Sequence, residues 1–305
     1  MIRRFIQRVL GTSGKPETGR PARGPLILAR GKHGIRRDDI DACALRTCET
    51  LADAGFKAFV VGGAVRDLLL EQKPKDFDIA TDATPEEVRR LFRRSRIIGR
   101  RFRIVHVMCG RDTVEVTTFR AAGSLGGDEE DERPTDESGR ILEDNVFGSQ
   151  AEDAARRDFT VNALYYDPLR EEVHDYFNGV ADCRRKTLRM IGDPATRYRE
   201  DPVRMLRAAR LAAKLDFRID SATRKPVAEL AGLLDNVPRA RIFDEAVKLL
   251  MSGHALRGVH QLRAEGLHHG MLPLLDTILD DDQGRRFIEA GLKNTDERIH
   301  QDKPA

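Results

Sequence analysis

The sequence predicts an α+β protein in which a head with a small mixed sheet is followed by an all-helical portion. Up to about residue 188, apolar segments of strand length alternate with helical segments and glycine-rich turns. From about residue 194, apolar residues recur at helical spacing, with Pro and Gly between the helices. The 305 residues suffice for two domains. We therefore expect a flexible basic arm at 1–34, a head at 35–188 and a helical neck and body at 189–305.

The elements of the head are expected in a simple order. A helix over 38–54 ends at Gly55 and leads into a short apolar strand that closes with two glycines. The segments from there on are a strand at 56–63, a helix at 65–71, a strand at 76–81, a helix at 84–95, a hairpin of strands at 103–110 and 113–120, a mobile polar loop at 121–145, a helix over about 150–165 and a strand at 173–177.

Four helical segments are expected in the second portion. They cover 201–217, 221–235, 238–253 and 256–275, and the polar end at 293–305 contains no closing element.

Composition excludes several classes of protein. Hydrophobic residues make up 40% and charged residues 34% of the chain, which is typical of a soluble globular protein. No apolar stretch approaches the roughly 20 residues that span a bilayer, and the basic segment at 1–10 lacks the apolar region of a signal peptide. The four cysteines show neither CxxC nor paired spacing, which argues against zinc, against a disulfide framework and for a reducing compartment. We expect a cytoplasmic protein without a membrane span.

The segment VVGGAVRDLLL at 60–70 places two glycines between a strand and a helix. Gly62 and Gly63 allow backbone N–H groups to approach a phosphate closely, and Arg66 can add a charge-assisted contact. The same residues also fit a tight turn without a ligand, because the pattern is neither GxGxxG nor a Walker loop.

The segment KPKDFDIAT places Asp76 and Asp78 two residues apart. On a strand such residues share a face, and two adjacent carboxylates repel unless a cation lies between them. Mg2+ prefers oxygen ligands and leaves positions open for substrate phosphates. An isolated DxD pattern is weak, but its position shortly after the glycine turn indicates a metal and triphosphate site.

Two further carboxylates compete for the role of third acidic group. Glu115 lies between two valines of an alternating strand, so its side chain can point toward the Asp pair, although it also fits an exposed position. In RRDFTVNALYY, Asp158 and Asn162 lie one helical turn apart beside Arg157, and Asp158 also fits a helix N-cap.

The segment REDPVRMLRAARLAAK at 199–214 combines acidic and basic side chains. Glu200 and Asp201 precede Arg204 and Arg207 on an expected helix. Carboxylates and a guanidinium together can read a base edge, because the first accept and the second donates hydrogen bonds. An amphipathic helix with a basic solvent face is the alternative.

These motifs together resemble the class II nucleotidyltransferases, the family of bacterial poly(A) polymerases and CCA-adding tRNA nucleotidyltransferases. The resemblance runs from about residue 35 to 275, and the motifs follow in the family's order. It implies an enzyme in which Asp76 and Asp78 carry two Mg2+ ions and Asp158 is a further active-site carboxylate, with Glu115 on the strand that usually supplies the third acidic group. It also implies that the nucleotide is bound by Gly62, Gly63, Arg66, Asp67, Arg157, Asn162, Glu200, Asp201, Arg204 and Arg207.

The resemblance is stronger to the poly(A) polymerase branch, because of RIIGRRFRIVHVM at 96–108 and EDPVR at 200–204. It implies ATP as substrate, RNA 3′ ends as partner and template-independent addition of AMP. CCA addition to tRNA is the alternative reaction, and a non-catalytic RNA- or nucleotide-binding short form is the alternative of another class. Members of that branch continue beyond residue 305, so RNA affinity is expected to suffer first.

Overall fold

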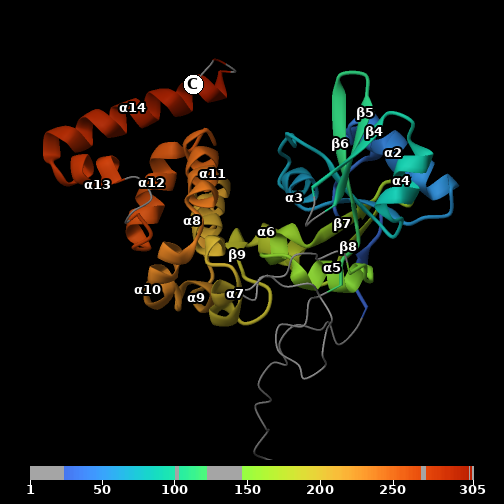
Figure 1. Cartoon of the computed structure of the whole chain (residues 1–305), viewed down its shortest axis with the longest axis horizontal. Helices are drawn as coiled ribbons and strands as arrows, with labels where there is room; N and C mark the ends of the chain where they lie inside the picture. The colour runs from blue at the N-terminus through green and yellow to red at the C-terminus, as the bar shows by residue number, and fades with distance from the viewer. Residues whose placement is uncertain (1–23, 100–102, 122–145, 269–272, 302, 304–305) are drawn as a thin grey trace, which may run out of the picture.

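The computed structural model describes residues 24–99, 103–121, 146–268, 273–301 and 303. Figure 1 shows a sheet with its helices in the first part of the chain and a group of helices in the second. The strands of the sheet are β1 (Leu26–Leu28), β2 (Ala58–Val61), β3 (Asp78–Thr81), β4 (Ser95–Ile98), β5 (Ile104–Cys109), β6 (Asp112–Thr118), β7 (Leu164–Asp167) and β8 (Glu172–Asp175).

The sheet is mixed. Its strand order is β1-β8-β7-β2-β3-β6-β5-β4, with β3 and β6 parallel and the other neighbouring strands antiparallel. The helices of this part are α2 (Ala42–Asp53), α3 (Gly63–Leu69), α4 (Pro85–Leu91), α5 (Gln150–Arg156), the 3-10 helix η2 (Thr160–Asn162) and α6 (Gly179–Arg184). The short 3-10 helix η1 (Arg37–Asp39) precedes α2.

Side-chain alternation gives the sheet two buried faces. Val60 and Ile79 pack in a large core with α2, whereas their strand neighbours Phe59 and Ala80 pack in a smaller cluster on the other face. Because residues two apart share a face, Asp78 emerges on the side of Ala80. The strand pattern therefore sends the Asp78 carboxylate to the face that carries the smaller cluster.

The second part of the chain is helical, as predicted. Its elements are α7 (Pro194–Glu200), α8 (Val203–Leu215), α9 (Ser221–Arg224), α10 (Val227–Leu230), the 3-10 helix η3 (Ala231–Asn236), α11 (Arg239–Leu250), α12 (Ala255–Ala264), α13 (Pro273–Asp280) and α14 (Asp282–His300). A small parallel pair, β9 (Thr187–Leu188) with β10 (Arg218–Ile219), joins the end of the first part to the second. The predicted α+β class with a helical body is confirmed.

The predicted helix over 150–165 is wrong beyond residue 156. Helix α5 ends at Arg156, η2 follows, and the chain then enters β7, which pairs with β2 and β8. Leu164, Tyr165 and Tyr166 are fully buried in that strand. Aromatic residues favour such pleated, buried positions, so tertiary pairing overrides the helical spacing of this segment.

Other differences concern the two ends of the chain. The expected flexible arm at 1–34 is wrong for its last residues, because β1 pairs antiparallel with β8 and His33 is buried. Strand β4 and the small β9–β10 pair were not expected either. The polar end was expected to lack an element, yet α14 runs to His300. Asp281 caps its N-terminus, and Asp296 accepts hydrogen bonds from the N–H groups that begin α12.

The expectation against a disulfide framework missed one disulfide bond. Cys43 in α2 is joined to Cys109 at the end of β5, across 66 residues of sequence. Sequence spacing carries no signal for two cysteines that only the packing of a helix on a strand brings together. Cys48 and Cys183 are free and buried.

Two expectations are left open by the fold. The predicted mobile loop at 121–145 lies, but for Ala121, outside the described residues. Among the described residues, no helix is long and apolar enough to cross a membrane.

Candidate active site

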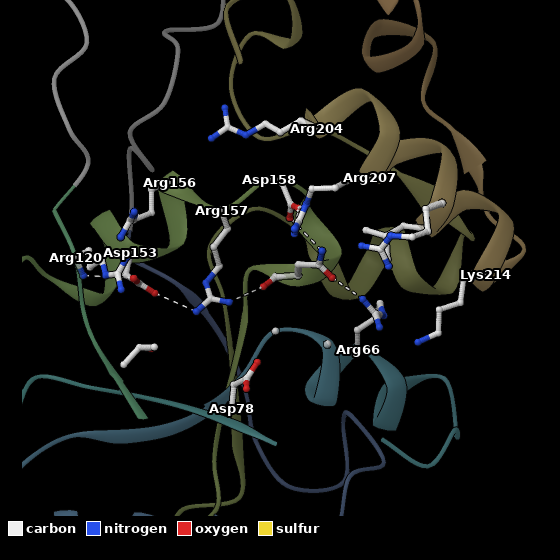
Figure 2. A pocket seen from close by; sticks show the side chains of 16 residues that line it. Arg66, Asp78, Arg120, Asp153, Arg156, Arg157, Asp158, Arg204, Arg207 and Lys214 are labelled. Carbon is white, nitrogen blue, oxygen red and sulfur yellow. Dashed lines mark hydrogen bonds and ion pairs between the residues drawn. The ribbon is translucent and has the colours of Figure 1, made fainter. Parts of the chain in front are cut away.

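A cavity of about 550 Å3 lies between the sheet and helix α8. Its wall is strongly basic, since eight arginine and lysine side chains line it against three aspartates (Figure 2). The lining residues are Gly62, Gly63, Arg66, Asp78, Thr117, Arg120, Asp153, Arg156, Arg157, Asp158, Asn162, Arg204, Arg207, Arg210, Leu211 and Lys214. An excess of positive charge in a concave site attracts a polyanion.

The turn from β2 to α3 needs glycine at Gly62. Its φ of 71° lies in the left-handed region, and a Cβ there would stand 3.1 Å from Nη1 of Arg157. Both facts exclude a larger side chain without strain. Gly62 and Gly63 both line the cavity, and the guanidinium groups of Arg157 and Arg66 lie directly beside them.

Asp78 lies beside Glu115. Strands β3 and β6 run parallel with these two residues in register, so both carboxylates leave the same face of the sheet. Asp78 lines the cavity and is open to solvent, unlike the three residues that follow it in β3. Partial desolvation of its carboxyl group by the surrounding protein, with repulsion from Glu115 and from Asp76, raises the pKa of Asp78 to about 6, against an opposing attraction from Arg157.

Asp76 precedes β3 and is exposed; it does not line the cavity. His106, which the sequence did not single out, lies on β5 with Nε2 3.3 Å from Oε1 of Glu115. Among the described residues, no group of three or more His, Cys, Asp or Glu side chains is already gathered as a metal site. The carboxylates of Asp76, Asp78 and Glu115 nevertheless fit a hard divalent cation, because they repel one another and offer only oxygen ligands.

Asp158 has a different environment. Its Oδ2 accepts two hydrogen bonds from Arg207, at 2.9 Å from Nε and 2.6 Å from Nη2, and its Oδ1 accepts from Asn162 and from the backbone of Phe159. Although burial opposes it, these contacts hold the pKa of the Asp158 carboxyl below its ordinary value. Both oxygens are therefore occupied by protein donors, which separates Asp158 from the Asp78 pair.

Arg66 is held in the same network. Its guanidinium donates to Asp67 Oδ1 at 2.8 and 2.6 Å and to Asn162 Oδ1 at 2.6 Å. Arg66 and Asp67 are both buried. Asp67, predicted to hold the triphosphate, is instead the residue that fixes Arg66, and it does not line the cavity.

Arg157 is fixed from three sides. It donates to the Tyr165 hydroxyl at 3.1 Å, to Asp153 Oδ2 at 3.1 Å and to the backbone oxygen of Asn162 at 3.2 Å, and it lies 5.1 Å from the Tyr165 ring centroid. Tyr165 in turn donates to Asp153 at 2.7 Å. Neither Asp153 nor Tyr165 was predicted to belong to the site, although Tyr165 lies in the segment RRDFTVNALYY.

The residues predicted to read a base are also paired with one another. Glu200 Oε2 accepts from Arg204 and from Arg197, each at 2.9 Å. Asp201 accepts from Arg241 at 2.9 Å. Arg204 and Arg207 line the cavity, whereas Glu200 and Asp201 do not.

The cavity thus brings together most of the predicted residues but not all. Those outside its lining are Asp67, Asp76, Glu115, Glu200 and Asp201. Lining residues that the sequence did not assign to the site are Thr117, Arg120, Asp153, Arg156, Arg210, Leu211 and Lys214. Arg210, Leu211 and Lys214 fall within the segment at 199–214 and lie on the same helix as Arg207.

Comparisons with known proteins agree with this geometry. Residues 58–189 match a family model described as the poly A polymerase head domain, and residues 216–279 match one described as a probable RNA and SrmB-binding site of polymerase A. Poly(A) polymerase I of Haemophilus influenzae is 47% identical over 277 residues, which cover 90% of this chain and 61% of that protein.

More distant similarity extends to CCA-adding enzymes. That of Lactobacillus helveticus is 40% identical over 219 residues, covering 71% of this chain and 52% of that protein. The crystal structure of the Bacillus stearothermophilus CCA-adding enzyme in complex with CTP has a TM-score of 0.64 at 33% identity, over 78% of this chain and 55% of that one. The chain spans less than two thirds of the length of each of these proteins.

Proposed function

The chain belongs to the class II nucleotidyltransferase family of bacterial poly(A) polymerases and CCA-adding enzymes, and from that premise we propose that it adds AMP from ATP to RNA 3′ ends without a template. One observation carries the proposal. The Gly62–Gly63 turn, the Asp78 carboxylate and the arginine face of α8 meet in a single cavity.

In the proposed reaction, the RNA 3′ hydroxyl attacks the α-phosphorus of ATP in line. The hydroxyl gives its proton to water, and a bond forms from its oxygen to the α-phosphorus. The bond between the α-phosphorus and the oxygen that bridges it to the β-phosphate breaks, and pyrophosphate leaves with that oxygen. No covalent enzyme intermediate is needed. The protein contributes position and charge, which dominate catalysis of phosphoryl transfer.

Asp76 and Asp78 are the proposed holders of Mg2+, and the neighbouring Glu115 adds negative charge. Magnesium, when bound as two ions, neutralises charge that develops at the reacting phosphate and lowers the pKa of the attacking hydroxyl. Asp158 is proposed as a positioning residue, because Arg207 and Asn162 already occupy its oxygens.

The phosphates are proposed to lie along the Gly62–Gly63 turn and Arg66. Arg66 needs no rearrangement to meet them, because Asp67 and Asn162 already fix its guanidinium. Arg157 is oriented in the same way by Asp153 and Tyr165. Fixed donors stabilise developing charge at little cost of reorganisation.

We propose that Arg204 selects the base. Glu200 orients the Arg204 guanidinium, and Asp201 is the next residue in the chain after Glu200. Arg207 is placed beside Arg204 by Asp158. A guanidinium held in one orientation presents a fixed pattern of donors, which suits discrimination between bases. RNA is the proposed partner, by analogy with the relatives' names and with the match of residues 216–279.

The test is incorporation of each of the four labelled nucleotides, with Mg2+, on oligoadenylate and on tRNA lacking its terminal nucleotides. We expect ATP to be used on oligoadenylate. Preference for CTP on the trimmed tRNA would instead establish CCA addition, which the similarity to CCA-adding enzymes keeps as the second candidate. Calorimetric binding of ATP without incorporation on any RNA would indicate a binding protein only.

A further inference from the structure

Lys214 lies on the cavity face of α8 but has no role in the family motifs described above. The residues Arg204, Arg207, Leu211 and Lys214 recur at intervals of three and four and all line the cavity. At 1.5 Å per residue, this face extends about 15 Å from Arg204 to Lys214. Figure 2 shows Lys214 on the same side of the cavity as Arg66, with Arg204 well apart from both.

The other cations on this part of the wall already have anionic partners. Arg66 pairs with Asp67, Arg207 with Asp158 and Arg204 with Glu200. Arg210 donates to the buried Glu245 at 2.8 Å. Within the part of the chain that the structure describes, Lys214 makes neither a hydrogen bond nor an ion pair, although it is half-buried.

A partly buried ammonium without a counter-ion is costly, and its neighbours here increase the cost. Burial lowers the pKa of Lys214; Asp67 opposes this effect, and the nearby Arg66, Arg210 and Lys75 add to it. The charged form of Lys214 becomes favourable when an anion binds between it and these neighbouring cations.

The position of that anion follows from the proposed nucleotide orientation. In that orientation the reacting phosphate would lie near Asp78, and the remaining phosphates would extend toward Gly63 and Arg66, which also line the cavity. Lys214 lies beyond this point, on the Arg66 side of the cavity. Its ammonium is therefore placed for the far end of the phosphate chain and not for the base or the reacting atom.

We propose that Lys214 binds the terminal phosphate of the nucleotide and makes the site select triphosphates over diphosphates. This inference rests on the proposed function, because it assumes that a nucleotide occupies the cavity. After transfer, the same contact is kept with the departing pyrophosphate. Lys214 would thus be a specificity-determining residue of the site.

The experiment is titration calorimetry of the full chain with Mg2+-ATP and with Mg2+-ADP, without RNA. We expect the wild-type protein to bind ATP at least about tenfold more tightly than ADP, which is the usual scale of one charge-assisted contact. In Lys214→Met, ATP affinity should fall to that of ADP, and ADP affinity should change less than about twofold. Lys214→Arg, which keeps the charge, should retain most of the preference.

A matched control is Lys225→Met, because Lys225 is exposed and outside the cavity. It should bind both nucleotides as the wild type does. Equal losses of ATP and ADP affinity in Lys214→Met, or an unchanged ratio, would overturn the assignment of Lys214 alone. If the wild-type protein binds neither nucleotide, the proposed function fails as well. Should Lys214→Met not fold, as judged by circular dichroism, the ratio in Lys214→Gln decides by the same criteria.

Discussion

The two walls of the cavity differ in their electrostatics: carboxylates repel one another at the sheet, whereas arginines on α8 are paired with carboxylates. On the sheet wall, Asp78 lies beside Glu115, which is outside the cavity lining, and desolvation together with repulsion from Glu115 raises the pKa of Asp78 to about 6. On the α8 wall, Arg204 and Arg207 are each held by a carboxylate of the protein. The carboxylates on the sheet side therefore repel one another, whereas the arginines on the α8 wall are held by carboxylates of the protein.

This difference suggests that the sheet wall serves the reaction and the α8 wall serves recognition of the ligand. Carboxylates that repel one another gain from a divalent cation, and they are placed by the rigid register of two parallel strands. Arginines that are already paired gain little from a cation but present fixed donors to an anionic or polar ligand. Substitutions on the two walls should consequently have different consequences for activity and for stability.

The largest effect is expected for Asp78→Asn. Loss of the carboxylate removes a proposed ligand of the metal, and incorporation of AMP should fall by about a thousandfold or more. The melting temperature at neutral pH should not fall, because ionised Asp78 is unfavourable in the folded protein. Asp112→Asn, an exposed carboxylate at the start of β6, is the control and should leave both quantities unchanged.

Asp158→Ala, unlike Asp78→Asn, should lower the stability of the protein. Removing this carboxylate leaves Arg207 without its main partner and Asn162 without an acceptor. We expect the free energy of unfolding to fall by about 2 kcal/mol, since Arg207 retains partial access to water. Urea denaturation measures this change, and Asp244→Ala on the exposed face of α11 is the control. A stability equal to that of the wild type would show that the pair is not preorganised.

Gly62→Ala tests the close approach of the glycine turn to Arg157. The backbone at φ 71° and a Cβ 3.1 Å from Arg157 Nη1 should together cost about 1–2 kcal/mol and displace Arg157. Gly55→Ala is a matched control, because Gly55 also has a positive φ but nothing within 4 Å of its Cβ. Both variants should lose stability, but only Gly62→Ala should lose nucleotide affinity by calorimetry.

Arg204→Lys should alter recognition with little change in chemistry. Lysine keeps the charge but not the planar fork of donors, so the preference for ATP over CTP should fall by about tenfold. The ratio of kcat/KM for the two nucleotides measures this effect. Arg224→Lys, on α9 and outside the cavity, is the control. An unchanged ratio in Arg204→Lys would assign base selection to another residue.

The smallest effects should appear in the pH dependence of stability. Asp78 has a folded-state pKa above its ordinary value of about 4, so its ionisation lowers stability as pH rises through about 4 to 6. Asp158 has a lowered pKa, so it stabilises the fold above about pH 4 and loses this contribution as pH falls. Melting temperatures between pH 2 and 7 should therefore show two separate changes relative to the wild type. Asp78→Asn should gain as pH rises from about 4 to 6, and Asp158→Asn should lose as pH rises toward about 4 and change little above it. Parallel curves for the two variants would contradict the opposite shifts.

The sheet wall could be predicted from sequence more fully than the α8 wall. Alternation along two strands is a local rule, and it correctly placed Glu115 beside Asp78. The partners on α8 could not be found in this way. Asp158 meets Arg207 across 49 residues, and Arg210 meets Glu245 across 35, so only the packed helices define these pairs.

The errors have a related cause. Helical spacing suggested one helix for 150–165, but pairing of β7 with β2 and β8 determines that segment. Asp153 and Tyr165, which orient Arg157, become neighbours only because that helix ends early. Long-range contacts of this kind leave no periodic trace in the sequence.

The most direct measurement is extension of an oligoadenylate primer with labelled ATP and Mg2+, by the wild type and by Asp78→Asn at equal concentrations. The account predicts stepwise addition of AMP by the wild type, no extension by Asp78→Asn, and pyrophosphate released in equal amount to the AMP added. Extension by Asp78→Asn at the wild-type rate, or AMP addition that does not require Mg2+, would contradict it.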